Sequence, residues 1–262
     1  MRWIYISPHL DDAIFSAGGL IYEQISAGAS VEIWTVMSGI PYNAELTDFA
    51  QKLHSLWGAS SAKEAMQIRR AENEDAAKVL GAKTSYLDFL DCMYRRSPHG
   101  EALYKNSFSV PHKTERGLPA QIARTLAERV QPDDILVCPL ALGKHTDHVV
   151  VRKAVELLGQ SPVYIADIPY SLNKPLALNS EVSGMTESFQ EISAAGLTLW
   201  LDAATAYKSQ IAIEFQTPKW MREQITVYWA GQNGIRFWQG MTDKRRNNLQ
   251  VFDFLRSLIN KR

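Results

Sequence analysis

This sequence has few cysteines, no long hydrophobic run and no excess of positive or negative charge. Only two of its 262 residues are cysteine, which excludes the disulfide framework of a small secreted domain. Cys92 and Cys138 are expected to be reduced, as in a cytoplasmic protein. No run of about 18 apolar residues occurs, and no basic head with an apolar core stands at the start. We therefore expect neither a membrane span nor export by a cleaved signal peptide.

The charges of the chain balance. It carries 28 Lys and Arg against 28 Asp and Glu, so its formal net charge is zero. A nucleic-acid-binding protein needs a basic excess or a basic stripe to contact phosphates. Here the clearest basic clusters are isolated pairs, Arg69-Arg70 and Arg95-Arg96, so nucleic acid is not an expected partner. With 46% hydrophobic residues, the chain can bury a large core.

The first feature that carries chemistry is the segment Ser7-Pro8-His9-Leu10-Asp11-Asp12. It follows the run Trp3–Ile6, whose aromatic and β-branched residues are typical of a strand. The turn after this strand offers one imidazole and two carboxylates, which suit Zn²⁺ or Fe²⁺. A simpler interpretation also fits, because Asp11 or Asp12 could be the N-cap of a helix that starts near Ala13.

A second segment of the same kind, Gly143-Lys144-His145-Thr146-Asp147-His148, weakens that simpler interpretation. It also follows a buried-strand pattern, Asp134–Leu140, and also opens an apolar helix. Parallel strands of a doubly wound sheet end on the same side, so both segments are expected to meet in one crevice. One metal ion can then bind between them, with a carboxylate and an imidazole left beside it. The ligands would be His9, Asp12 and His148, and the remaining pair Asp11 and His145.

Strand patterns and helix patterns alternate along the chain. Strands are expected near residues 3–7, 31–37, 84–89, 134–140 and 162–168, and helices near 13–28, 60–80, 117–130, 147–159 and 203–214. This alternation favours right-handed βαβ units. It predicts an α/β, Rossmann-like three-layer fold with a mostly parallel sheet flanked by helices, plus a C-terminal extension. Gly18 and Gly19 are expected where the first helix packs closely on the sheet.

The whole chain, residues 1–262, is expected to form a single domain with its catalytic core over 1–170. Residues 171–262 are expected to pack a strand and helices onto that core. The strand is predicted over 197–202, and an amphipathic helix over 248–259. Four of the seven tryptophans lie in this part. They fit either a packing layer over the sheet or an interface between two copies of the chain, so a homo-oligomer stays open.

Four segments together carry a resemblance to a known family. They are SPHLDDAIFSAGG, RRAENEDAAKVLGA, the strand and acidic turn over 86–91, and PLALGKHTDHVVVRKAV. In content and order they resemble the PIG-L or LmbE-like family of zinc-dependent deacetylases, which remove acetyl groups from N-acetylglucosamine-type sugars and related amides. Two departures are mild. Leu10 stands where a proline is frequent, and the loop 141–144 is less rich in glycine.

The resemblance implies a role for each candidate residue. His9, Asp12 and His148 would bind zinc, or iron, while Asp11 would be the general base. A protonated His145 would stabilise the oxyanion. Either His145 or the newly protonated Asp11 would protonate the leaving amine, and the sequence leaves that choice open. Asp147 would orient one of the imidazoles. Arg69 would face the substrate, and so would one of Arg95 and Arg96, with Arg95 as the candidate.

The chemistry of these residue types leads to the same activity. Amide hydrolysis needs a strong nucleophile, and a bound Zn²⁺ lowers the pKa of its water from about 16 towards 7. We therefore expect a metal-dependent N-deacetylase acting on a small N-acetylated sugar or glycoconjugate. Two alternatives stay open. One is a mononuclear metal amidohydrolase or a phosphoesterase acting on another small substrate, and the other is a catalytically silent sugar-binding protein of the same fold.

Two long segments, Gly39–Gly58 and Met93–Pro119, are expected to build the substrate pocket as loops that leave strand ends. They contain aromatic residues that are candidates for stacking on a sugar ring. These are Tyr42, Trp57, Tyr94 and Tyr104. Packing in the core or in a lid is the simpler explanation for each of them.

Overall fold

A computed structural model describes residues 1–42, 45–173 and 175–240 of the chain. The strands of these residues form one sheet in the order β3-β2-β1-β4-β5-β7-β6. Their bounds are β1 Arg2–Ser7, β2 Ser30–Thr35, β3 Lys83–Tyr86, β4 Ile135–Pro139, β5 Val163–Ile165, β6 Met185–Glu191 and β7 Gly234–Gly240. The first five strands are parallel, whereas β7 runs antiparallel to β5 and to β6. The predicted mostly parallel sheet is therefore confirmed.

The order of the strands reverses between β1 and β4. From β1 the chain moves outwards to β2 and β3, and it then returns to place β4 on the other side of β1. In doubly wound sheets the crevice for a ligand opens at such a reversal, beyond the carboxyl ends of the two strands. Both ligand segments predicted from the sequence begin at these two ends.

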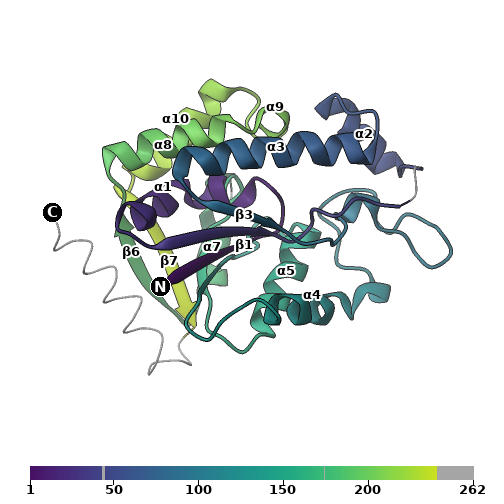
Figure 1. Ribbon diagram of the computed structural model, residues 1–262, viewed down its shortest axis with the longest axis horizontal. Helices are drawn as coiled ribbons and strands as arrows, with labels where there is room; N and C mark the ends of the chain where they lie inside the picture. Colours follow the sequence, from purple (N-terminus) through teal and green to yellow (C-terminus); the bar gives the residue numbers. More distant parts are fainter. Residues whose placement is uncertain (43–44, 174, 241–262) are drawn as a thin grey trace.

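Helices cover both faces of the sheet and complete the predicted three layers (Figure 1). On one face lie α1 (Asp12–Ser26), α3 (Ala62–Leu80), α8 (Ala194–Thr205) and α10 (Pro218–Ala230), and on the other lie α4 (Leu118–Ala127) and α5 (Thr146–Glu156). The remaining helices are α2 (Asp48–Trp57), α6 (Tyr170–Asn173), α7 (Pro175–Glu181) and α9 (Lys208–Glu214). No helix in the described ranges is long and apolar enough to cross a membrane.

The central strand β1 is buried on both of its faces. Trp3 and Tyr5 join the core under α1, α3 and α8, whereas Ile4 and Ile6 join the core under α4 and α5. Alternate side chains of a strand point to opposite faces, so a strand between two helical layers must be apolar throughout. Each such side chain contributes about 1.5–3 kcal/mol by burial. This packing fixes the end of β1, where His9 and the two aspartates follow.

The strand predicted over 197–202 is wrong, because these residues belong to helix α8. The predicted helix over 203–214 is two elements, since α8 ends at Thr205 and α9 starts at Lys208. Leu197, Trp200, Leu201 and Ala204 are spaced as on one face of a helix, and that spacing outweighs the short alternation of apolar residues. The helix predicted over 248–259 lies outside the described residues.

Gly18 and Gly19 let α1 approach α8 rather than the sheet, which corrects the sequence-based expectation. A Cβ atom on Gly18 would lie 2.3 Å from Cδ1 of Trp200, and one on Gly19 would lie 2.8 Å from Ile192. The Trp200 indole fills the space above the two glycines and donates a hydrogen bond of 2.7 Å to the carbonyl of Ile14. The C-terminal part thus packs tightly on the helix that carries Asp12.

Candidate functional site

The two ligand segments meet at the carboxyl ends of β1 and β4. Asp11 occupies the N-cap position of α1, but its side chain makes no capping hydrogen bond. Asp12 is the first residue of that helix. The capping interpretation of these aspartates therefore does not account for the Asp11 carboxylate, which lines a cavity together with Asp12.

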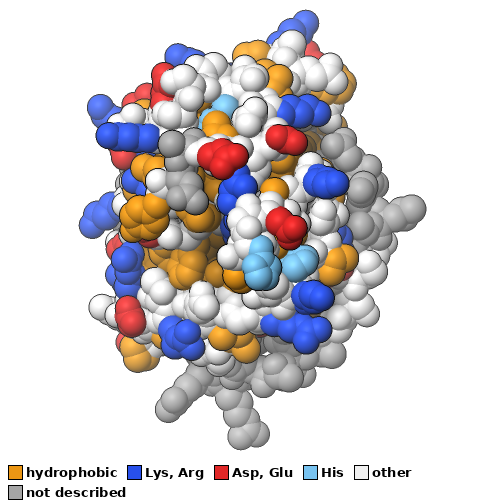
Figure 2. Space-filling model, turned by 90° about the vertical axis from the view of Figure 1, so that its right-hand side faces the viewer, with side chains coloured by type: hydrophobic (Ala, Val, Ile, Leu, Met, Phe, Trp, Pro, Cys, Tyr) orange, Lys and Arg blue, Asp and Glu red, His pale blue; other side chains and the backbone are white. Residues whose placement is uncertain are grey.

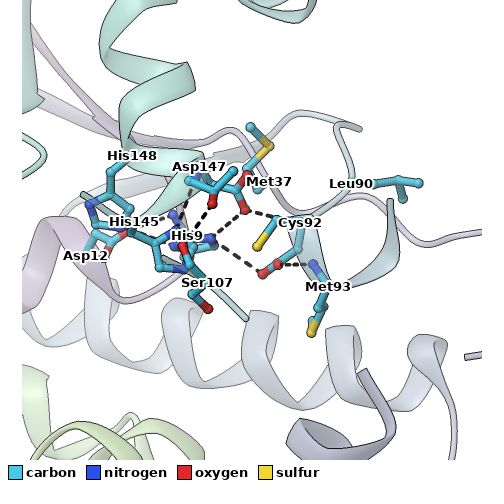
Figure 3. Close-up of polar contacts among 12 residues, drawn as sticks. His9, Asp12, Met37, Leu90, Cys92, Met93, Ser107, His145, Asp147 and His148 are labelled. Atoms are coloured by element: carbon cyan, nitrogen blue, oxygen red, sulfur yellow. Dashed lines mark hydrogen bonds and ion pairs between the residues drawn. The ribbon is translucent and has the colours of Figure 1, made fainter. Parts of the chain in front are cut away.

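Three donor atoms converge between the segments (Figure 3). Oδ2 of Asp12 lies 3.2 Å from Nδ1 of His9 and 3.2 Å from Nε2 of His148. Ligands about 2.0–2.1 Å from a tetrahedral zinc ion are about 3.3–3.4 Å apart. Nε2 of His148 is fully buried, and no atom among the described residues forms a hydrogen bond with it. The spacing and this unsatisfied nitrogen both fit a bound metal ion.

A carboxylate stands behind each of the two imidazoles. Oδ2 of Asp147 lies 3.2 Å from Nε2 of His9, and Oδ1 of Asp167 lies 2.8 Å from Nδ1 of His148. Each carboxylate accepts a hydrogen from the ring nitrogen that points away from Asp12. The opposite nitrogen is then free to bind a metal, as in carboxylate–histidine–zinc arrangements. Asp147 thus contacts an imidazole, as the sequence analysis expects, whereas Asp167 was not anticipated.

The pKa shifts reflect the carboxylates gathered around the two imidazoles. Burial lowers the pKa of His148, but Asp12 and Asp167 outweigh it and raise the value to about 10. Burial also lowers the pKa of His9, but three carboxylates outweigh it and raise the pKa well above its ordinary value. These belong to Asp12, Asp147 and Asp91. The pKa of Asp12 is held well below its usual range, because the two histidines outweigh its burial. Such a cluster of carboxylates favours positive charge at its centre.

Arg95 is placed behind the ligands and does not line the cavity. Its Nη2 lies 2.6 Å from Oδ1 of Asp147, and its Nε lies 2.9 Å from Oε1 of Glu115. Asp147 is therefore held between the His9 imidazole and a guanidinium. Cys92, His145 and Asp147 also lie close enough to hold an ion, but the charge of Arg95 on Asp147 opposes a second cation there.

Arg69 and Asp11 form a buried pair at the floor of a cavity. Nη2 of Arg69 lies 3.0 Å from Oδ1 of Asp11, and its guanidinium stacks on the ring of Trp57 with 4.9 Å to the centroid. Burial raises the pKa of Asp11, whereas the charge of Arg69 opposes that rise. Burial prevails, so the pKa of Asp11 lies above its ordinary value, while the guanidinium limits that rise and fixes the orientation of the carboxylate.

His145 is the N-cap of α5, and its ring is held from the backbone side. Nδ1 accepts a hydrogen bond of 3.1 Å from the amide of Asp147. Burial lowers the pKa of His145 well below its ordinary value, and the neighbouring imidazoles of His9 and His148 add to the effect. The lowered pKa favours the neutral imidazole over the protonated form expected from the sequence, and the amide of Asp147 places the hydrogen of that neutral ring on Nε2.

A cavity of about 260 Å³ opens above these groups. Its polar floor contains His9, Asp11, Asp12, Arg69 and His145. Its walls come from α2, from α9, and from the segments 106–108 and 168–170. Figure 2 looks onto this end of the molecule and shows a hollow lined largely by hydrophobic side chains. The site therefore combines a charged floor with mostly apolar walls, as small-molecule sites commonly do.

The aromatic candidates from the sequence are distributed unevenly. Trp57 lines the cavity, Tyr94 and Tyr104 are buried in the surrounding structure, and Tyr42 is fully exposed. Sequence reasoning missed other residues that line the cavity, namely Phe108, Tyr170, Gln210 and Glu214. It also missed Asp167, although its position directly after β5 is a signal of the kind that pointed to His9.

Comparison with known proteins agrees with this geometry. Residues 4–158 match the PIG-L family, described as GlcNAc-PI de-N-acetylase. A 2′-N-acetylparomamine deacetylase from Niallia circulans is 27% identical over 189 residues, which are 64% of this chain and 67% of that protein. The zinc-inhibited form of teicoplanin deacetylase has a TM-score of 0.80 and 22% identity, covering 93% of this chain and 100% of that one. The deacetylase of the A40926 pseudoaglycone has a TM-score of 0.73 and 24% identity, covering 91% and 96%. At these identities the two structural matches show a shared fold.

Proposed function

The chain belongs to the PIG-L family, and we propose that it is a metal-dependent hydrolase that removes the N-acetyl group from an N-acetylglucosamine-type sugar or glycoconjugate. The relative from Niallia circulans is a deacetylase of an N-acetylated amino sugar compound, 2′-N-acetylparomamine. The observation that carries the proposal is the convergence of three donor atoms beside a separate buried carboxylate, at the floor of one cavity.

His9, Asp12 and His148 are the proposed metal ligands, and Zn²⁺ is the proposed ion, with Fe²⁺ compatible with the same donors. When bound, such a cation polarises the acetyl carbonyl and lowers the pKa of a water molecule. Asp147 and Asp167 hold the two imidazoles in the tautomers that ligation requires. The pairing of Arg95 with Asp147 supports one ion rather than two.

Asp11 is the proposed general base. It lines the cavity next to Asp12, and Arg69 fixes one of its oxygens at 3.0 Å. A carboxylate in this position can accept a proton from the attacking water as the new C–O bond forms. Arg69 supports this role because its charge favours the ionised form of a group whose burial favours the neutral form.

His145 is the proposed donor to the oxyanion. Because its Nδ1 accepts the Asp147 amide, the hydrogen lies on Nε2 and can be donated to the negative oxygen of the tetrahedral intermediate. To become an imidazolium, His145 would have to give up that hydrogen bond. We therefore assign the second proton transfer to Asp11, which returns the proton from water to the leaving nitrogen. The C–N bond then breaks, and acetate and a free amine are released.

The proposal is tested by measuring acetate release from a panel of N-acetylated sugars by the zinc-loaded protein. The panel should contain N-acetylglucosamine glycosides, chito-oligomers, thiol-sugar precursors and 2′-N-acetylparomamine. We expect Asp11→Asn to keep its metal and lose about 10²–10⁴-fold in kcat, because general base catalysis contributes this much. His148→Ala should lose the metal itself.

Metal analysis by mass spectrometry decides between the proposal and its alternatives. One ion per chain and acetate release agree with the proposal. Two ions per chain would favour a phosphoesterase, and one ion without acetate release from any substrate would favour a silent sugar-binding protein. An Asp11→Asn variant with wild-type turnover would overturn the role given to Asp11.

A further inference from the structure

Phe108 is a large apolar side chain that is 60% exposed at the cavity. Its ring centroid lies 5.8 Å from that of His145 and 6.0 Å from that of Tyr170, and both pairs are nearly perpendicular. Single exposed apolar residues are common on protein surfaces and need no explanation by themselves. This ring differs because it stands directly beside the proposed oxyanion donor.

The loop around Phe108 is fastened to the start of α5. Thr146, which is fully buried, follows His145 in sequence. Its amide donates to the carbonyl of Ser107 at 2.7 Å, and its hydroxyl donates to the carbonyl of Ser109 at 2.6 Å. The carbonyls on both sides of Phe108 are thus bound to one residue, and Figure 3 shows Ser107 next to His145. The position of the ring is therefore set relative to the catalytic imidazole before any substrate binds.

An exposed ring held in this way adds little to the stability of the fold. The part of a side chain that stays in water contributes no burial energy, so the fastening of this loop is not explained by core packing. A ligand that covers the ring, however, gains the free energy of burying the ring and does not first have to order the loop. The rigid loop and the exposed ring together point to a contact made with the substrate.

We propose that Phe108 is the platform on which the sugar ring of the substrate stacks, and that it positions the acetamido group over the polar floor of the cavity. This inference rests on the proposed function. A pyranose of the glucosamine type carries its substituents equatorially, so each ring face is a patch of axial C–H groups. Such a face is apolar and slightly positive, and it complements the negative face of an aromatic ring. The substrate class is therefore a cyclic N-acetylated sugar rather than an open-chain N-acetyl amide.

Variants of Phe108 separate stacking from other contacts. Phe108→Ala removes the ring, Phe108→Leu keeps an apolar side chain without an aromatic face, and Phe108→Trp keeps the face. Val110→Ala is the matched control, because Val110 lies in the same loop and is 88% exposed. All four changes affect exposed side chains, so the variants should fold as the wild type does.

The variants are assayed with two substrates that differ in ring closure. These are the methyl β-glycoside of N-acetylglucosamine and N-acetylglucosaminitol, its open-chain reduced counterpart. Phe108→Ala should lower kcat/KM for the glycoside roughly 10- to 30-fold, mainly by raising KM, and should change kcat/KM for the alditol less than about twofold. Phe108→Trp should keep kcat/KM for the glycoside within about threefold of the wild type, whereas Phe108→Leu should not. Val110→Ala should leave kcat/KM unchanged for both substrates.

An equal loss on both substrates, or a Phe108→Leu variant as good as Phe108→Trp, would overturn the inference. The second result would assign the ring to a general apolar contact with an acyl group or aglycone.

Saturation-transfer NMR with the methyl β-glycoside of glucosamine, which has no acetyl group, tests stacking without turnover. The axial ring protons should receive the strongest saturation from the wild type and lose it in Phe108→Ala. Stacking without acetate release from any substrate refutes the proposed function alone. Acetate release that is insensitive to Phe108 refutes this inference alone, and the absence of both refutes both.

Discussion

Replacing Asp167 with asparagine tests whether the carboxylate behind His148 sets the metal affinity of the site. Oδ1 of Asp167 accepts from Nδ1 of His148 at 2.8 Å, and Oδ2 accepts from the amide of Leu142 at 3.1 Å. Both neighbours are donors, and Asp167 is only 1% exposed. An asparagine has one acceptor oxygen and one NH₂ group, so it must turn a donor towards one of these two donors.

The expected effect has two parts. One buried donor is left without an acceptor, which costs about 1–3 kcal/mol in the stability of the metal-free protein. The loss of the carboxylate behind a ligating histidine lowers metal affinity about 10- to 100-fold, which corresponds to about 1.4–2.7 kcal/mol. We therefore expect Asp167→Asn to bind zinc at least tenfold more weakly than the wild type.

Zinc affinity is measured by competition with a chromogenic chelator, and stability by urea unfolding of the metal-free protein. Asp202→Asn is the matched control, since Asp202 is exposed and pairs with Arg222 at 2.9 Å on the surface. Exposed pairs contribute about 0–1 kcal/mol, so this control should bind zinc as the wild type does. If Asp167→Asn has a native circular dichroism spectrum and its zinc affinity is within twofold of the wild type, the assignment of Asp167 is refuted.

Two further predictions concern packing and charge around the site. Gly18→Ala gains about 1 kcal/mol in helix propensity, but its Cβ would lie 2.3 Å from Trp200. We expect a net loss of about 1–3 kcal/mol in urea unfolding, which Trp200→Phe should partly relieve; strictly additive effects in the double variant would contradict the clash. Burial and the charges of Asp11 and Asp12 raise the pKa of Glu214 to about 7, from an ordinary value of 4.5. The folded metal-free protein therefore binds this proton more tightly than the unfolded chain, and stability is lost as the pH rises from about 4.5 through 7. Glu214→Gln should be more stable than the wild type by about 3 kcal/mol at pH 8 and nearly equal to it at pH 4.5; equal stability at both pH values would show that Glu214 is solvated.

The parallel part of the sheet could be predicted because its strands are continuous apolar runs between helical patterns. Strands β6 and β7 were missed for different reasons. In β6 most side chains are exposed, so the segment has neither an apolar run nor a regular alternation. The strand β7 follows helix α10 as an antiparallel partner of β5, a pairing between residues about 70 positions apart that no local pattern encodes. Helix α8 was misread because Leu197-Thr198-Leu199 alternates briefly like a strand before Trp200.

The candidate ligands could be predicted because each segment holds its residues within a few positions of a strand end. His9 and Asp12 share one turn, and His145 and His148 share another. The groups around them come from separate loops and helices, and their meeting depends on the tertiary fold. Arg95 follows the acidic turn in sequence, yet the chain directs its guanidinium to Asp147 and away from the cavity. Sequence proximity to a motif therefore did not decide which arginine lines the cavity.

The family match ends at residue 158, and all the proposed metal ligands, Asp11 and His145 lie before that point. Much of the cavity wall lies after it, in the segment 168–170 and in α9. The proposed metal site and the later part of the cavity wall would act independently if no residue contacted both. Asp167 and Tyr170 connect them, because one holds His148 at 2.8 Å and the other contacts both His148 and Phe108 through its ring. A change in the segment after β5 should therefore alter metal affinity and sugar binding together, whereas a change at the uncharged Ile213 of α9, which lines the cavity, should alter sugar binding alone.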